Sequence, residues 1–165
     1  MKSILLKSLL IINFLFIYNC RAQTTTNDYI TFYNDVVPKL NSIVPTKTQF
    51  YGQNFSNFSN ELQNKNIDVV LLTYDTKTAP GIKYYVLNLF FTNHVMWSIA
   101  NDNDYQLPAI SITFENEIPS QIEQLTIQNQ GKWNSNLAQF FSNMKIESIR
   151  FIGLNGYNSQ DNSLK

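Results

Sequence analysis

Two runs of β-branched and aromatic residues, separated by a short turn, predict a β-hairpin in the middle of this chain. The runs cover residues 67–74 and 82–92, and the segment between them contains the pair Pro80-Gly81. Strands joined this closely run antiparallel. The second run is apolar at both alternating sets of positions, so both of its faces need cover. Either helices lie on both sides, or the sheet curls around a partly filled concave face.

Helical periodicity precedes the hairpin. Apolar residues at spacings of three and four predict helices over residues 28–44 and 53–64. Asn27 is the expected N-cap of the first helix, and Pro45 ends it. Pro38 either kinks this helix or starts another one.

Further strands and helices follow the hairpin. Residues 94–99 and 109–115 predict two more strands, joined across residues 101–104. Ser120 and Glu123 have the spacing of a capping box, which predicts a helix over residues 121–128. Asn134 or Ser135 then caps a last helix. Residues 146–154 predict a closing strand, followed by a polar tail that we expect to fray.

The order of elements is therefore α-α-β-β-β-β-α-α-β. Helices and strands are segregated along the chain, which favours an α+β fold over a parallel α/β fold. We expect an antiparallel sheet of about five strands, with N-terminal helices and a C-terminal helix pair packed on it. In the strand over residues 109–115, apolar and polar residues alternate, so one face should meet water.

The N-terminus has the pattern of an export signal. Lys2 and Lys7 precede an apolar run over residues 9–18, which is too short to span a bilayer. Residues 1–22 are thus predicted to be a signal peptide, and residues 23–165 one globular domain. Cleavage after Ala22 would release the domain, whereas cleavage before Cys20 would leave that cysteine lipidated, as in bacterial lipoproteins.

Composition excludes several classes of function. Three of the twelve Lys and Arg residues and none of the twelve Asp and Glu residues lie in residues 1–22, so residues 23–165 carry a net charge of −3. Nucleic-acid binding is therefore not expected. Cys20 is the only cysteine, which leaves no disulfide, cysteine nucleophile or cysteine-ligated metal in the domain. Membrane contact is expected only through an N-terminal lipid.

No motif predicts catalysis. The sequence contains no P-loop, dinucleotide-binding or nucleophile-elbow pattern, and His94 is the only histidine. The run over residues 101–104 does not fit an EF-hand. A loop that starts at Asp104 has Glu115 at its twelfth position but Ala109 at the sixth, where Gly is required, and a loop that starts at Asp102 has Thr113 at the twelfth. We expect no cofactor, no metal site and no catalytic residue.

The turn over residues 101–104 is the first candidate binding site. It is the densest polar stretch between two apolar segments, and loops on a rigid scaffold commonly carry binding residues. An aromatic residue follows the turn, and Trp97 before it can reach the same rim. The candidate residues are Asn101, Asp102, Asp104, Tyr105 and Trp97.

A second candidate patch follows from strand alternation. Tyr84 and Asn88 are predicted to share a face of the second long strand, and His94 to lie on the same side of the next strand.

The expected function is that of an exported binding domain without catalytic activity, either lipid-anchored in the bacterial envelope or secreted. Its profile resembles that of immunity proteins, inhibitors and accessory lipoproteins, which favours a protein partner. The alternatives are a glycan- or small-ligand-binding module, and a small hydrolase that uses carboxylates.

The lipoprotein alternative predicts that the mature chain begins at a lipidated Cys20. Mass spectrometry of the native N-terminus measures this directly. An unmodified chain that begins at Gln23 would contradict the prediction.

Overall fold

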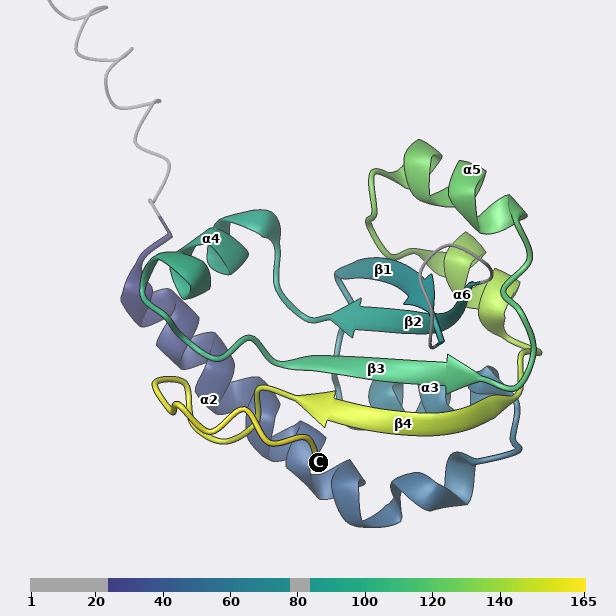
Figure 1. Ribbon diagram of the computed structural model, residues 1–165. Coiled ribbons are helices and arrows are strands. Elements are labelled where there is room, and N and C mark those ends of the chain that lie inside the picture. The colour runs from purple at the N-terminus through teal and green to yellow at the C-terminus, as the bar shows by residue number, and fades with distance from the viewer. Residues whose placement is uncertain (1–23, 78–83) are drawn as a thin grey trace, which may run out of the picture.

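The computed structural model describes residues 24–77 and 84–165. The predicted signal peptide, Cys20 and the middle of the hairpin turn lie outside these residues. Within them the chain forms an α+β fold with four antiparallel strands in the order β1-β2-β3-β4 (Figure 1). The strands are β1 (Leu71–Thr76), β2 (Tyr84–Phe90), β3 (Ala109–Phe114) and β4 (Ile146–Ile152).

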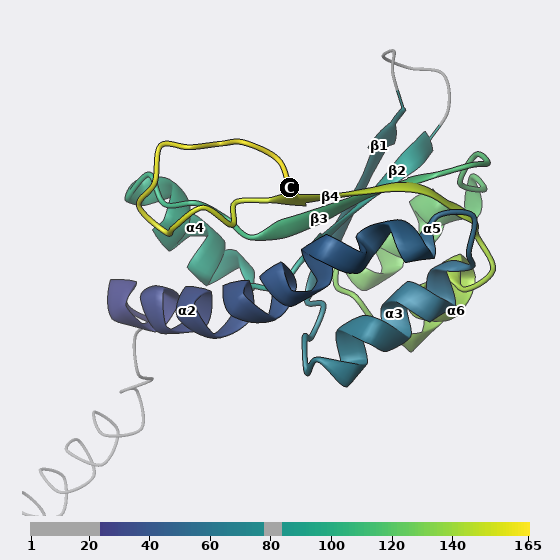
Figure 2. The same cartoon turned by 90° about the horizontal axis from the view of Figure 1, so that it is seen from below.

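Helices occur before the first strand and between the later strands. The chain enters through α2 (Thr26–Ile43), a 3-10 helix η1 (Val44–Phe50) and α3 (Phe55–Asn64). Helix α4 (His94–Asp102) separates β2 from β3, and α5 (Gln121–Asn129) and α6 (Ser135–Phe141) separate β3 from β4. Helices α2 and α3 lie beneath one face of the sheet (Figure 2).

The core lies between this face and the helices. Strand β3 contributes Ile110, Ile112 and Phe114, which are fully buried, while Ser111 and Thr113 point the other way. The predicted alternation of β3 is therefore confirmed. On β2, Leu87 and Leu89 are fully buried on the same side.

The other face of the sheet is more polar. Strand pairing aligns one residue from each strand in a row across it, and Asn88 Nδ2 donates a hydrogen bond of 3.2 Å to Thr73 Oγ1 within that row. Near one end, Phe90 packs on Trp97 of α4, with ring centroids 4.5 Å apart. This row is Thr73, Asn88, Ser111 and Arg150.

The predicted strand over residues 94–99 is wrong, because this segment is the first part of α4. The side chain of Asn93 caps the helix by accepting a hydrogen bond of 3.0 Å from Met96 N. Ala100 is buried, and Met96 and Ile99 pack against the core, which is helical spacing. The sheet therefore has four strands among the described residues, not five.

Two predicted caps are also wrong. Helix α2 begins with Thr25 as N-cap, because Thr25 and Asp28 form a reciprocal capping box. The hydrogen bond from Thr25 N lowers the pKa of the Asp28 carboxyl. Ser120 makes no side-chain capping bond, since its own backbone is already helical. Pro38 lies within α2, and the helix continues through it.

The caps provide a matched stability test. Asn134 accepts a hydrogen bond of 3.1 Å from Leu137 N at the start of α6, so Asn134→Ala should lower the free energy of unfolding by about 1 kcal/mol. Ser120→Ala should change it by less than about 0.5 kcal/mol. Urea denaturation followed by circular dichroism measures both. Equal losses would contradict the assignment of the caps.

Candidate functional site

A polar pocket of about 600 Å³ lies at the end of the sheet where β3 begins and β4 ends. Three segments enclose it: the C-terminal end of α4, the connection from α4 to β3, and the C-terminal tail, residues 153–165. We call it the tail pocket. Its polar wall consists of Asn101, Asp104, Tyr105, Gln106, Ser159, Gln160 and Asn162.

The end of α4 brings the predicted turn to the pocket. Tyr105 N donates to Ala100 O at 2.8 Å, and Asp104 N donates to Asn101 O at 3.3 Å. These two bonds form a Schellman motif, in which the residue after the C-cap takes a left-handed conformation. Asp104 occupies that position with a φ of 54°. Asp and Asn tolerate this conformation better than most other residues do.

Gln106 connects the turn to the tail. Its side chain is 8% exposed, and its Nε2 donates to Ser159 O and to Asn162 Oδ1, both at 2.8 Å. Its backbone N donates to Tyr157 O at 2.7 Å. Both N–H groups of the side-chain amide are thus engaged. Oε1, an acceptor, is the group that Gln106 can offer a ligand.

Two tyrosines of α2 fix the backbone around the pocket. The hydroxyl of Tyr33 donates to Gly153 O and accepts from Gly156 N, each at 2.9 Å. The hydroxyl of Tyr29 donates to Gln106 O. Burial raises the pKa of Tyr29 and of Tyr33 above the usual range, so both phenols stay neutral donors at physiological pH.

The tail is ordered, so the prediction that it frays is wrong. Asn155 Nδ2 donates to Asp161 O and Ser163 O, each at 3.0 Å. Lys165 and Phe151 exchange two backbone hydrogen bonds of 2.8 and 3.0 Å at the outer edge of β4. The turn that starts the tail requires glycine, because Gly153 has a φ of 68° and an added Cβ would lie 2.4 Å from Leu107 O.

The structure separates the first group of candidate residues. Asn101, Asp104 and Tyr105 line the tail pocket, whereas Asp102 is exposed outside its wall. Trp97 packs on Phe90, away from the pocket. The ring of Tyr105 stacks on Tyr29, at 5.8 Å between centroids, and contacts Tyr157 edge-on at 5.2 Å.

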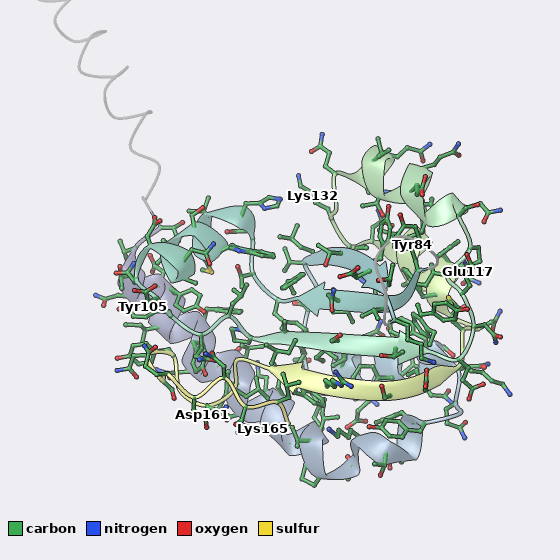
Figure 3. The ribbon with its side chains drawn as sticks, viewed as in Figure 1. Tyr84, Tyr105, Glu117, Lys132, Asp161 and Lys165 are labelled. Carbon is green, nitrogen blue, oxygen red and sulfur yellow. The ribbon has the colours of Figure 1, made fainter. Side chains whose placement is uncertain are left out.

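The second candidate patch does not form. The register of β1 and β2 shifts so that Val86 pairs with Asp75 while Tyr84 pairs with Thr76. This irregularity turns Tyr84 onto the core face, where its ring packs edge-on against Tyr74 at 4.8 Å. Asn88 lies on the opposite face, and His94 is the exposed first residue of α4. Figure 3 shows Tyr84 and Tyr105 at opposite ends of the molecule.

A second concavity, of about 460 Å³, lies between α4, β1 and α5. Its lining is mainly apolar and includes Leu71, Leu72 and Trp97, with His94 at its border. The hydroxyl of Thr126 is buried there without a hydrogen-bond partner within the described residues. On α5, Ile127 is 77% exposed next to Thr126.

Among the described residues, no pair of carboxylates lines the tail pocket. Of the Asp and Glu residues that the structure describes, only Asp104 lies in the wall of the tail pocket. Glu117 lies at the far end of the molecule from Tyr105 and Asp161 (Figure 3). In residues 24–77 and 84–165, no three His, Asp or Glu side chains are placed to hold a metal ion. In the same residues, no helix has the length and apolar character needed to cross a bilayer.

The sequence reasoning missed Gln106 and the tail residues of the pocket. Gln106 follows Tyr105 and the polar run over residues 101–104 and precedes an apolar segment, and the tail has glycines at 153 and 156 among Asn, Asp and Ser. These residue types favour turns that bond their own backbone, which is a signal for an ordered loop. The partners that hold the loop lie more than 50 residues away.

Comparison with known protein families, with curated proteins and with solved structures finds no match to this chain. The site must therefore be interpreted from its own chemistry.

The tyrosine hydroxyl that holds the tail provides a further test. Tyr33→Phe leaves Gly153 O and Gly156 N without their partner, which should lower the free energy of unfolding by about 1–3 kcal/mol. Tyr51→Phe is the matched control, because the Tyr51 hydroxyl lies 3.5 Å from Ile149 O, and its loss should cost less than about 0.5 kcal/mol. Urea denaturation measures both variants. Similar losses in the two would show that the tail is held by other contacts.

Proposed function

We propose that this chain is an exported binding domain without catalytic activity, and that it holds a segment of a protein partner at the tail pocket. The observation that carries the proposal is the convergence of Asn101, Asp104 and Tyr105 with Gln106 and the tail on one polar concavity. Export rests on the predicted signal in residues 1–22, with Cys20 as the proposed site of lipid attachment.

The fixed backbone of the pocket supports a binding role. Gln106 and Tyr33 hold the tail in place through side-chain hydrogen bonds before any ligand arrives. A preformed site loses little conformational entropy on binding, so more of the contact energy appears as affinity. Polar groups on such a frame fix the orientation of a ligand.

A protein partner fits the pocket better than a glycan does. Sugar rings commonly stack on an open aromatic face, and Tyr105 is the aromatic residue in the polar wall. Its ring already contacts Tyr29 and Tyr157. The amide groups of Asn101, Gln106 and Gln160 suit the backbone and polar side chains of a peptide segment.

The hydrolase alternative has less support. Hydrolysis by two carboxylates needs a pair about 5–9.5 Å apart around one cleft. Asp104 is the carboxylate in the pocket wall among the described residues, and the exposed Asp102 lies outside that wall.

Filling the pocket tests the proposal. Gln160→Trp places a bulky side chain in the wall, whereas Asn158→Trp places the same side chain on the same tail outside the wall. The immobilised full-length mature protein is used to capture partners from the cells that produce it. Affinity for the captured partner is then measured by calorimetry.

We expect Gln160→Trp to weaken binding at least about tenfold, the usual effect of a steric block at the centre of an interface, and Asn158→Trp to leave it unchanged. Equal affinities for the two variants would place the site elsewhere. A wild-type protein that captures no partner would contradict the proposed function itself.

A further inference from the structure

We infer that the tail pocket receives a cationic group, the ammonium or guanidinium of a lysine or arginine side chain on the partner. The inference rests on the proposed function and names the chemistry of the ligand at the same site. It follows from the hydrogen-bonding and charge properties of the pocket wall.

The charge of the wall is negative. Asp104 is the one acidic side chain among the described residues that line the pocket, and no lysine or arginine lines it. Asp161 stands close by on the tail, in the segment between two wall residues, Gln160 and Asn162. A backbone hydrogen bond from Ser163 lowers the pKa of Asp161, so its carboxylate remains charged at physiological pH. An anionic ligand would therefore meet repulsion here.

Lys165 is the one basic residue of the tail, and its ammonium is bound outside the pocket lining. Lys165 Nζ donates to Asn41 Oδ1 at 3.2 Å and to Leu154 O at 3.4 Å. These partners tie the ammonium to α2 and to the first part of the tail. The Lys165 ammonium also lowers the pKa of Asp161 and so offsets part of that charge, but Lys165 does not line the pocket with Asp104.

Helix α4 adds to the negative potential. Its last turn, with Ala100 and Asn101, forms part of the pocket wall. The C-terminal end of a helix carries the negative end of its dipole, which favours a nearby cation. No basic residue occupies the last turn of α4.

The buried amide of Gln106 points to a ligand that donates hydrogen bonds. Its Nε2 is engaged by Ser159 O and Asn162 Oδ1, which fixes the orientation of the amide. No described residue donates to Oε1, and Gln106, a residue 8% exposed, lines the pocket. Oε1 and the Asp104 carboxylate are both acceptors, so they suit a ligand with several N–H groups, which ammonium and guanidinium groups supply.

Two small probes test the inference on the full-length mature protein. N-acetyl-arginine amide carries the guanidinium, and N-acetyl-citrulline amide has nearly the same shape without the charge. Both are titrated while the side-chain amide of Gln106 and the backbone amide of Ser159 are followed by nuclear magnetic resonance. We expect saturable shifts at these amides with the arginine probe and much smaller shifts with the citrulline probe.

Two variants with the same change of charge test the role of Asp104. Asp104→Asn retains a residue that tolerates the left-handed conformation, so the turn should be preserved. It should weaken binding of the arginine probe about threefold to fivefold, as expected for one partly exposed charge pair. Asp102→Asn, adjacent but outside the wall, should weaken it less than twofold, about the scale of a screened charge at longer range.

Equal shifts with the two probes would overturn the inference, as would the absence of shifts with the arginine probe. N-acetylglucosamine serves as a third probe, and shifts from it alone would overturn the cation while retaining the pocket as a binding site. If Asp104→Asn changes the fold, the comparison of the two probes on the wild-type protein still tests whether the pocket binds a cation. Gln160→Trp and Asn158→Trp test the proposed function separately, because a steric block of the pocket acts on a ligand of any charge.

Discussion

The buried hydroxyls of two tyrosines on α2 are the contacts on which the rest of the site depends. Tyr29 holds the backbone of Gln106 at the start of β3, and Tyr33 holds Gly153 and Gly156 at the end of β4. A single helix thus fixes both sides of the tail pocket relative to the core. Because these hydroxyls are buried, a lost partner leaves backbone groups without hydrogen bonds, which costs more than losing an exposed contact. The tail can therefore be polar and still ordered.

Much of the fold could be predicted from the sequence because periodicity reports which face of an element is buried. The alternation in β3 and the helical spacing of α2 are examples of the patterns that predicted the fold class and the order of most elements. The segment that begins at His94 was misassigned because a short apolar run fits a strand or a helix. The structure decides for a helix, because Asn93 caps this segment and Ala100, the residue directly after the predicted strand, is buried. The cap predicted at Ser120 was wrong for a different reason. Ser120 and Glu123 have the spacing of a capping box, but the backbone of Ser120 is helical and its side chain makes no capping bond.

The candidate site could be predicted only in part. The turn after α4 was identified by its polarity, and Asn101 and Asp104 do line the pocket. The opposite wall could not be found in this way, because it depends on contacts between residues far apart in sequence. Gln106 meets Asn162 across 56 positions, and Tyr33 meets Gly156 across 123. Such pairs leave no local pattern. Tyr84 was misplaced because one irregular pairing reverses the faces of a strand beyond it.

The two concavities differ in what they demand of a ligand. The groove beside Trp97 is mainly apolar, so contact there would gain energy from any apolar surface and discriminate little. The tail pocket offers directed acceptors on a fixed frame, with Asp104 held in a turn and Gln106 held by two bonds. Because Asp104 and Gln106 Oε1 both accept hydrogen bonds, the proposed site would favour ligands that donate them. The only cysteine of the chain lies in the predicted signal. The frame of the pocket therefore depends on hydrogen bonds from tyrosine and amide side chains and not on disulfides. The same bonds that hold the C-terminal tail thus also position the acceptors of the proposed site.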